Sequence, residues 1–240
     1  MTGSWEIQKA RESRLLVVIL CPPDLNVSLD FTTVLRSIQL PPGSDFMRVV
    51  GAPFGPARNQ GARTALENGY HLAFLDADIR LAQHDAFIQL FNTGLDIVGG
   101  LYFQRFPPHL PVAFNEGRDD KGNIVKVPIA GWKPGDIVPA TFLPSGLTLY
   151  RRGLLSRMFE RFPRPFEWGV DTAPVPTEGG GQVPPFSEDF VFSFRSRQIG
   201  FQPFVMTGVW GLHECRAAVG PRWAVPYPSN EPTFGVVGVV

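Results

Sequence analysis

The stretch His71-Leu72-Ala73-Phe74-Leu75-Asp76-Ala77-Asp78 places an apolar run directly before two carboxylates. A continuous apolar run of this length is typical of a strand that is buried on both faces of a sheet. Residues 15–20, Leu-Leu-Val-Val-Ile-Leu, have the same character, and helical spacing of apolar residues follows each run. Strands that alternate with helices predict an α/β domain with a mostly parallel central sheet flanked by helices.

The periodicity and the turn residues place the individual elements. We predict strands at 14–20, 46–50, 71–75, 95–103, 147–150 and 201–206. We predict helices at 56–68, 84–92, 151–161 and 188–198, and a further helix that is capped by Ser28 or Asp30 and runs to about 38. Most of the 24 prolines follow residue 105, notably in 173–185 and 221–232. Because proline interrupts helices and central strands, we expect long irregular loops in the C-terminal half.

Composition excludes some classes of protein. The chain has 240 residues, enough for one α/β domain, and its 22 basic and 22 acidic residues cancel. A zero net charge argues against strong non-specific binding to nucleic acid or anionic membranes. Two cysteines cannot build a disulfide framework, and the run 15–20 is too short to cross a membrane. We therefore expect a cytoplasmic protein without a membrane anchor.

The carboxylates Asp76 and Asp78 are the most informative polar residues. They follow a buried strand, and ligands of open α/β sheets bind at the carboxyl ends of strands. Two carboxylates that converge there would suit Mg²⁺ or Mn²⁺, which prefer oxygen ligands and keep positions open for phosphate oxygens. The alternative is an ordinary solvated turn, since this short motif also arises by chance.

Other polar residues have a chemical and a structural interpretation. Arg58 and Asn59 begin the helix that precedes the Asp strand, where a phosphate could bind, or they are simply exposed. Glu188 and Asp189 open a later helix, so they either compensate its dipole or act in general base catalysis. His213 follows the last strand and is either structural or a ligand for Mn²⁺.

The order of these segments resembles that of a known enzyme family over about residues 14–214. The matching segments are Ala57-Arg58-Asn59, Leu75-Asp76-Ala77-Asp78, Ser145-Gly146-Leu147-Thr148-Leu149-Tyr150-Arg151-Arg152, Ser187-Glu188-Asp189-Phe190 and His213. Together they resemble the GT-A glycosyltransferases, particularly bacterial and phage members similar to glycosyltransferase family 2.

The resemblance implies a fold, a reaction and a set of site residues. It implies a single GT-A (Rossmann-like) domain over 1–240, with a nucleotide-sugar-binding half at about 14–110, an acceptor-side half at about 111–214 and an irregular tail at 215–240. It implies Asp189 as the catalytic base, with Glu188 beside it. The implied metal ligands, for Mn²⁺ or Mg²⁺, are Asp76, Asp78 and His213. The implied nucleotide-sugar-binding residues are Pro22, Asp24, Arg58, Asn59, Asp76, Ala77 and Gly146.

The substrates stay open. A UDP-sugar is the favoured donor, although Val50-Gly51-Ala52-Pro53 stands where many family members have an aspartate that grips the base. The acceptor is a glycan, a small molecule or a hydroxymethylated DNA base; arginines 151–164, 195 and 197 would line a groove for an anionic acceptor, or form a solvated face. Two other functions are a sugar-phosphate nucleotidyltransferase, disfavoured because residues 21–26 contain no glycine, and a non-catalytic sugar- or nucleotide-binding module.

Overall fold

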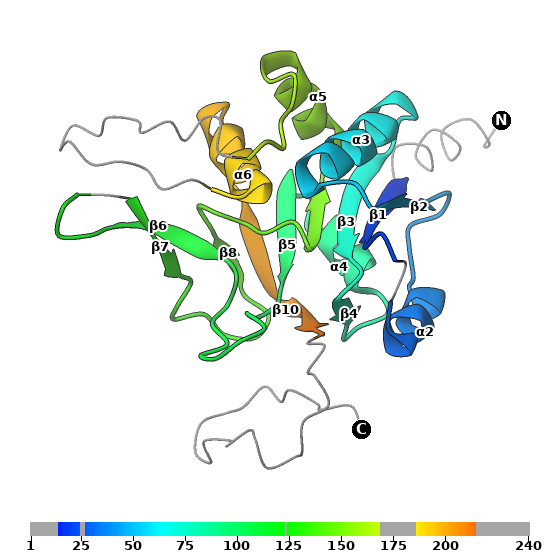
Figure 1. The fold of residues 1–240 in the computed structure, drawn as a ribbon, viewed down its shortest axis with the longest axis horizontal. Helices are drawn as coiled ribbons and strands as arrows, with labels where there is room; N and C mark the ends of the chain where they lie inside the picture. Colours follow the sequence, from blue (N-terminus) through cyan, green and yellow to red (C-terminus); the bar gives the residue numbers. More distant parts are fainter. Residues whose placement is uncertain (1–13, 25–26, 123, 169–185, 215–240) are drawn as a thin grey trace, which may run out of the picture.

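The computed structural model describes residues 14–24, 27–122, 124–168 and 186–214 (Figure 1). Its elements are β1 (Leu15–Cys21), α2 (Leu29–Ser37), β2 (Asp45–Val50), α3 (Phe54–Glu67), β3 (His71–Asp76), β4 (Ile79–Leu81), α4 (Ala86–Asn92), β5 (Ile97–Leu101), β6 (Phe114–Arg118), β7 (Ile124–Pro128), β8 (Ile137–Pro139), β9 (Leu147–Tyr150), α5 (Arg152–Arg161), α6 (Glu188–Gln198) and β10 (Phe204–His213). The irregular loops predicted within 173–185 and 221–232, and the tail at 215–240, lie outside these residues.

The main sheet has the order β2-β1-β3-β9-β5-β10-β4, with β8 paired to β10. Strands β2, β1 and β3 are parallel, and so are β5 and β10. Strand β9 lies between β3 and β5 and is antiparallel to both, which leaves these two groups pointing in the same direction. The prediction of a mixed α/β domain with a central sheet flanked by helices is therefore confirmed. The architecture is consistent with a single Rossmann-like domain.

Strand β1 explains how the sheet is buried on both faces. Side chains alternate along a strand, so Leu16, Val18 and Leu20 join one core cluster while the odd-numbered residues of the strand join the other. The first cluster contains residues of α3, α5 and α6, and the second contains residues of α2 and α4. Helices thus cover both faces (Figure 1).

Local signals set the helix positions. The Ser28 hydroxyl accepts the backbone N–H of Phe31 at 2.8 Å, so Ser28, rather than Asp30, caps α2. Helix α3 lies close against the sheet at Gly61, where an added Cβ would be 2.9 Å from Val18 Cγ1. Only glycine permits this approach, which positions the N-terminal turn of α3 over the end of β3.

Several elements differ from those predicted. Strands β4, β6, β7 and β8 were not predicted. The strands β4 and β8 have three residues and carry no periodic signal, β6 is mostly polar, and β7 is a short run that ends in a proline. The last strand covers 204–213 instead of 201–206: its side chains alternate between the core and partial exposure, but Gly208 and Gly211 interrupt the apolar pattern. This extension matters for function because it makes His213 part of β10.

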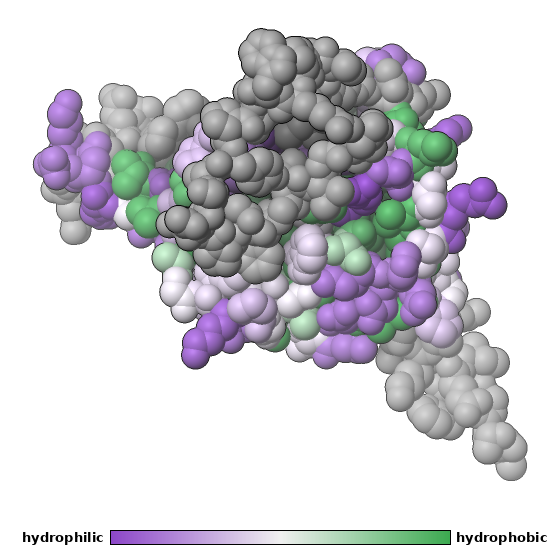
Figure 2. Space-filling model, turned by 90° about the horizontal axis from the view of Figure 1, so that it is seen from below, coloured by the Kyte–Doolittle hydropathy of each residue, from purple (hydrophilic) through white to green (hydrophobic). Residues whose placement is uncertain are grey.

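On the face that Figure 2 shows, hydrophobic residues lie in separate spots among hydrophilic ones. In the part of the chain that the structure describes, no helix has the length and apolar character needed to cross a membrane.

Candidate functional site

The two aspartates lie at the carboxyl end of β3, beside the end of the neighbouring strand β1. Asp76 closes β3, and its backbone N–H donates to the carbonyl of Gly146 at 2.9 Å, while the N–H of Ala77 donates to the carbonyl of Leu20 at 3.3 Å. The chain then turns through Ala77 and Asp78 into β4. The pair thus lies at the predicted edge of the sheet, where backbone direction changes and alternate side chains can face one site.

Asp78 and His213 are brought together by the pairing of β4 with β10. Ile79 lies opposite His213 in this antiparallel pair, and the backbone N–H of Glu214 donates to the carbonyl of Asp78 at 2.7 Å. As a result, Asp78 Oδ1 lies 3.9 Å from His213 Nε2. Two of the three predicted metal ligands are therefore neighbours.

The hydrogen bonds of His213 define its tautomer. Its Nδ1 lies 2.9 Å from the carbonyl oxygen of Phe103, which can only accept, so Nδ1 carries the proton. Nε2 then presents a lone pair, and it accepts a hydrogen bond from Arg105 Nε at 2.8 Å. Burial lowers the pKa of His213, the carbonyl of Phe103 opposes this shift, and the charge of Arg105 adds to it. A neutral imidazole with Nε2 unprotonated is the form that binds metals.

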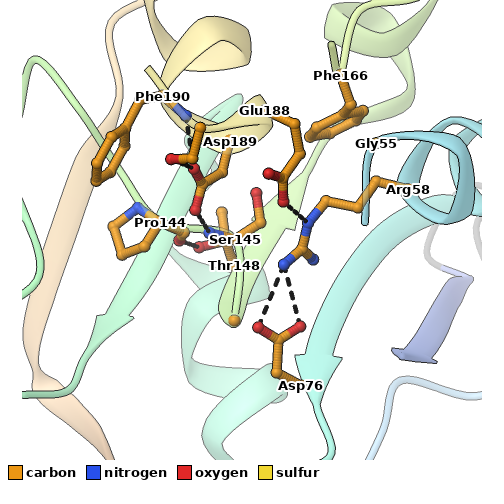
Figure 3. Close-up of polar contacts among 12 residues, drawn as sticks. Gly55, Arg58, Asp76, Pro144, Ser145, Thr148, Phe166, Glu188, Asp189 and Phe190 are labelled. Atoms are coloured by element: carbon orange, nitrogen blue, oxygen red, sulfur yellow. Dashed lines mark hydrogen bonds and ion pairs between the residues drawn. The ribbon is translucent and has the colours of Figure 1, made fainter. Parts of the chain in front are cut away.

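Asp76 belongs to a second group, centred on Arg58 (Figure 3). Arg58 Nη2 donates to Asp76 Oδ1 and Oδ2 at 3.1 and 3.2 Å, and its Nε donates to Glu188 Oε1 at 3.0 Å. The side chains of Arg58 and Glu188 are 3% and 4% exposed, and that of Asp76 is 22% exposed. The guanidinium thus links α3, β3 and α6 in one buried network.

The charges of this network shift the ionisation of its members. Burial would lower the pKa of Arg58, but the carboxylates of Asp76 and Glu188 reverse this effect and raise it above its ordinary value. The pKa of Glu188 is raised, first by burial and then by the neighbouring charge of Asp189, while Arg58 opposes the shift. Arg58 therefore remains a cation, and Glu188 ionises less readily than an exposed glutamate does.

Asp189 lies beside this network at the start of α6. Its Oδ1 accepts the hydroxyl of Ser187 and the backbone N–H of Phe190, the latter at 2.8 Å. Its Oδ2 accepts the backbone N–H of Ser145 at 3.3 Å. Asp189 is more exposed than Glu188, which is 3% exposed. The predicted acidic pair therefore divides into a buried partner of Arg58 and a carboxylate closer to solvent.

Gly146 lies where the two groups meet. A Cβ at this position would be 2.6 Å from the Tyr102 hydroxyl and 3.0 Å from Asp76 Oδ2. The backbone N–H of Gly146 also donates to that hydroxyl at 3.2 Å. The absence of a side chain thus lets Tyr102 and Asp76 approach each other, and the predicted role of Gly146 in nucleotide-sugar binding stays a prediction.

The remaining predicted residues lie at the same edge, with different surroundings. Asn59 donates to the carbonyl oxygens of Gly55 and Phe166 and accepts the N–H of Phe166, so its amide holds protein backbone. Pro22 is half-buried and Asp24 is exposed, both just after β1. Their binding roles, like that of the buried Ala77, stay predictions.

The three predicted metal ligands do not form one cluster here. Within the described ranges there is no group of three or more His, Cys, Asp or Glu side chains that could hold a metal ion. The reason is that Asp76 pairs with Arg58, whereas Asp78 and His213 both contact Arg105. Asp78 and His213 have the donor atoms that a divalent cation needs, but the Arg105 guanidinium lies between them.

Sequence reasoning missed Arg105 and Tyr102. Both follow β5, and both lie at the carboxyl edge that β5 shares with the neighbouring strand β10. Polar side chains just after a strand of a parallel sheet were the available signal.

The burial of Arg195 argues against the predicted basic groove. Its side chain is 4% exposed, and Nη1 donates to the carbonyl of Pro165 at 3.2 Å. Arg157 pairs with Glu160 on the exposed face of α5. Arg195 therefore serves packing, as does Arg151, whose guanidinium lies over the Phe91 ring and donates to the carbonyl of Phe91, whereas Arg157 fits a solvated face.

Comparison with known proteins supports the fold. No protein-family model and no curated protein matches the chain. Among solved structures, the chain is similar to A197 from STIV, with a TM-score of 0.56 and 18% identity over 84% of this chain and 86% of that one. It also matches GalNAc-T7 in complex with UDP, GalNAc and Mn²⁺, with a TM-score of 0.49 and 13% identity over 84% of this chain and 43% of that one. The likeness to A197 shows a shared fold and says nothing about activity.

Proposed function

We propose that this protein is a GT-A-type glycosyltransferase that transfers a sugar from a nucleoside diphosphate sugar to an acceptor hydroxyl. The observation that carries the proposal is the 3.9 Å approach of Asp78 Oδ1 to His213 Nε2, at the sheet edge that also carries Asp76. A carboxylate and an unprotonated imidazole nitrogen are both suitable ligands for Mn²⁺. The order of the matching sequence segments adds support, since all of them contribute to this edge.

Asp78 and His213 would hold the divalent cation. When bound, Mn²⁺ or Mg²⁺ supplies charge neutralisation for the departing diphosphate. The carbonyl of Phe103 keeps His213 in the tautomer whose Nε2 can serve as a ligand. Asp76 is paired with Arg58 and lies against Gly146, and its role as a third ligand stays a prediction.

Asp189 is the better candidate for the catalytic base. Among the described contacts, its Oδ2 accepts only the 3.3 Å bond from the amide of Ser145, so it can also accept a proton. In an inverting reaction the acceptor hydroxyl gives its proton to this oxygen while the acceptor oxygen bonds to the anomeric carbon and the bond to the diphosphate breaks. In a retaining reaction Asp189 would position substrate instead. Glu188 would act through Arg58, because the two side chains are paired and buried.

The test is to measure donor binding and breakdown. UDP-, GDP- and TDP-sugars are added with Mn²⁺, and melting temperature and release of nucleoside diphosphate are followed. We expect one donor to raise the melting temperature only with metal and to be hydrolysed slowly. Asp78→Ala should lose both effects, whereas the matched control Asp120→Ala, an exposed residue in the turn between β6 and β7, should keep them.

A non-catalytic binding module is the second candidate. It is favoured by the ion pairs of Asp76 with Arg58 and of Asp78 with Arg105, which give both carboxylates a cationic partner. The same experiment separates the two functions. Donor binding without release of nucleoside diphosphate, even with candidate acceptors, would support the module, and no binding of any donor would exclude the proposed transferase.

A further inference from the structure

Arg105 is presented to the site by a closed loop between β5 and β6. Phe103 and Pro111 form an isolated β-bridge, the N–H of Gln104 donates to the carbonyl of Leu110 at 2.9 Å, and the N–H of Val112 donates to the carbonyl of Tyr102 at 3.1 Å. The loop is therefore held by its own backbone bonds. The position of Arg105 is consequently defined by the fold.

The guanidinium of Arg105 contacts both donors of the proposed cation site. Its Nε donates to His213 Nε2 at 2.8 Å, across 108 residues of sequence, and its Nη2 pairs with Asp78 Oδ2. His213 Nε2 has one lone pair, so it can bind either this N–H or a metal, but not both. The two cations are thus mutually exclusive at His213.

The contacts of Arg105 with Asp78 and His213 are exposed enough for a metal ion to displace the guanidinium. The side chains of Arg105, Asp78 and His213 are 42%, 38% and 19% exposed. An ion pair this exposed is screened by water and contributes little to stability. Withdrawal of Arg105 into solvent is therefore inexpensive, and the loop backbone need not open.

We propose that Arg105 is an internal occupant of the cation site, which competes with the divalent cation for Asp78 and His213. This inference rests on the proposed function, because it concerns the same site. It accounts for the fact that one guanidinium contacts both Asp78 and His213, the two side chains that lie side by side at the proposed site. A merely structural ion pair would leave metal affinity unaffected by the loss of Arg105.

The experiment measures Mn²⁺ binding without nucleotide, by electron paramagnetic resonance of the free ion. We expect Arg105→Ala to bind Mn²⁺ roughly two- to fivefold more tightly than the unaltered chain, because the metal no longer has to displace an exposed ion pair, and such pairs are weak. Arg105→Lys keeps the charge and should gain less. Arg157→Ala, which removes an exposed arginine from α5, should match the unaltered chain.

Two further measurements assign the result to this site. The double variant Arg105→Ala with Asp78→Asn should lose the gain, and a circular dichroism melt checks that each variant is folded. Equal or weaker Mn²⁺ binding by folded Arg105→Ala would overturn the inference, as would no Mn²⁺ binding by any variant. If competition fails while Mn²⁺-dependent donor hydrolysis persists, only this inference falls. If Arg105→Ala binds Mn²⁺ more tightly but no nucleotide sugar binds, the proposed transferase function falls instead.

Discussion

Arg58 Nε donates a hydrogen bond to Glu188 Oε1 at 3.0 Å, joining two buried side chains that are 130 residues apart in the sequence. The same guanidinium also binds Asp76, so the start of α6 is tied to the end of β3 through α3. This buried ion pair fixes the start of α6, where Asp189 lies. It is also the feature whose loss is easiest to measure.

Replacing Arg58 by methionine should strongly destabilise the protein. The change leaves Asp76 and Glu188 without their buried cation, and breaking such a pair costs about 3–5 kcal/mol. Urea unfolding measures the loss. Arg157→Ala, on the exposed face of α5, should change the free energy of unfolding by no more than about 0.5 kcal/mol. A similar small change for both variants would show that the Arg58 network adds little stability.

The ionisation of Glu188 should make stability depend on pH. Its pKa in the folded protein is raised, so the folded state binds its proton more tightly than the unfolded chain does. The contribution of Glu188 is therefore favourable at low pH and is lost as pH rises through the raised pKa. Glu188→Gln keeps an acceptor for Arg58 without this charge.

Unfolding free energies of both proteins from about pH 4 to about pH 7 provide the test. The unaltered chain should lose stability relative to Glu188→Gln as pH rises across this window. A constant difference between the two curves would mean that the pKa of Glu188 is the same in the folded and unfolded states.

Gly146→Ala should destabilise the site by about 1–3 kcal/mol, the usual penalty for overpacking. The added methyl would press against the Tyr102 hydroxyl and Asp76 Oδ2, at 2.6 and 3.0 Å. Thermal or urea unfolding measures the effect. Tyr102→Phe in the same chain should recover part of it, because the nearer of the two contacts is removed.

Gly153→Ala is the matched control for this change. Gly153 lies in α5, and an added Cβ there would meet nothing within 4 Å. Since alanine favours a helix over glycine, this variant should be neutral or up to about 1 kcal/mol more stable. Equal losses at positions 146 and 153 would argue against crowding at the site.

Asp189→Asn should slow donor turnover by about 10²–10⁴-fold, the usual contribution of a general base. Asparagine preserves the acceptor oxygen for Ser187 or the backbone but cannot take up a proton. Donor affinity, from the rise in melting temperature, should remain. Normal turnover with intact folding would remove Asp189 from its proposed role, and a loss of donor affinity would point to a positioning role.

Much of the fold was determined by the sequence itself. The unbroken apolar runs of β1 and β3 require burial on both faces. The hydroxyl of Ser28 caps the first turn of α2 and so sets where this helix begins. The carboxylates of Asp76 and Asp78 follow a buried strand, so their place at the carboxyl edge of the sheet was also predictable. These features depend on residues that are close together in the chain, so local sequence patterns are enough to predict them.

Tertiary structure alone decided how the site is connected. The insertion of β9 between β3 and β5, and the length of β10, depend on strand pairing across long stretches of sequence. Strand pairing brings His213 to Asp78, and helix packing brings Arg58 to Glu188. Arg105 reaches His213 only because β5 and β10 are neighbours, and no spacing of residues encodes that. Local patterns specify which side chains are available, whereas the register of strands and the packing of helices determine which of them meet.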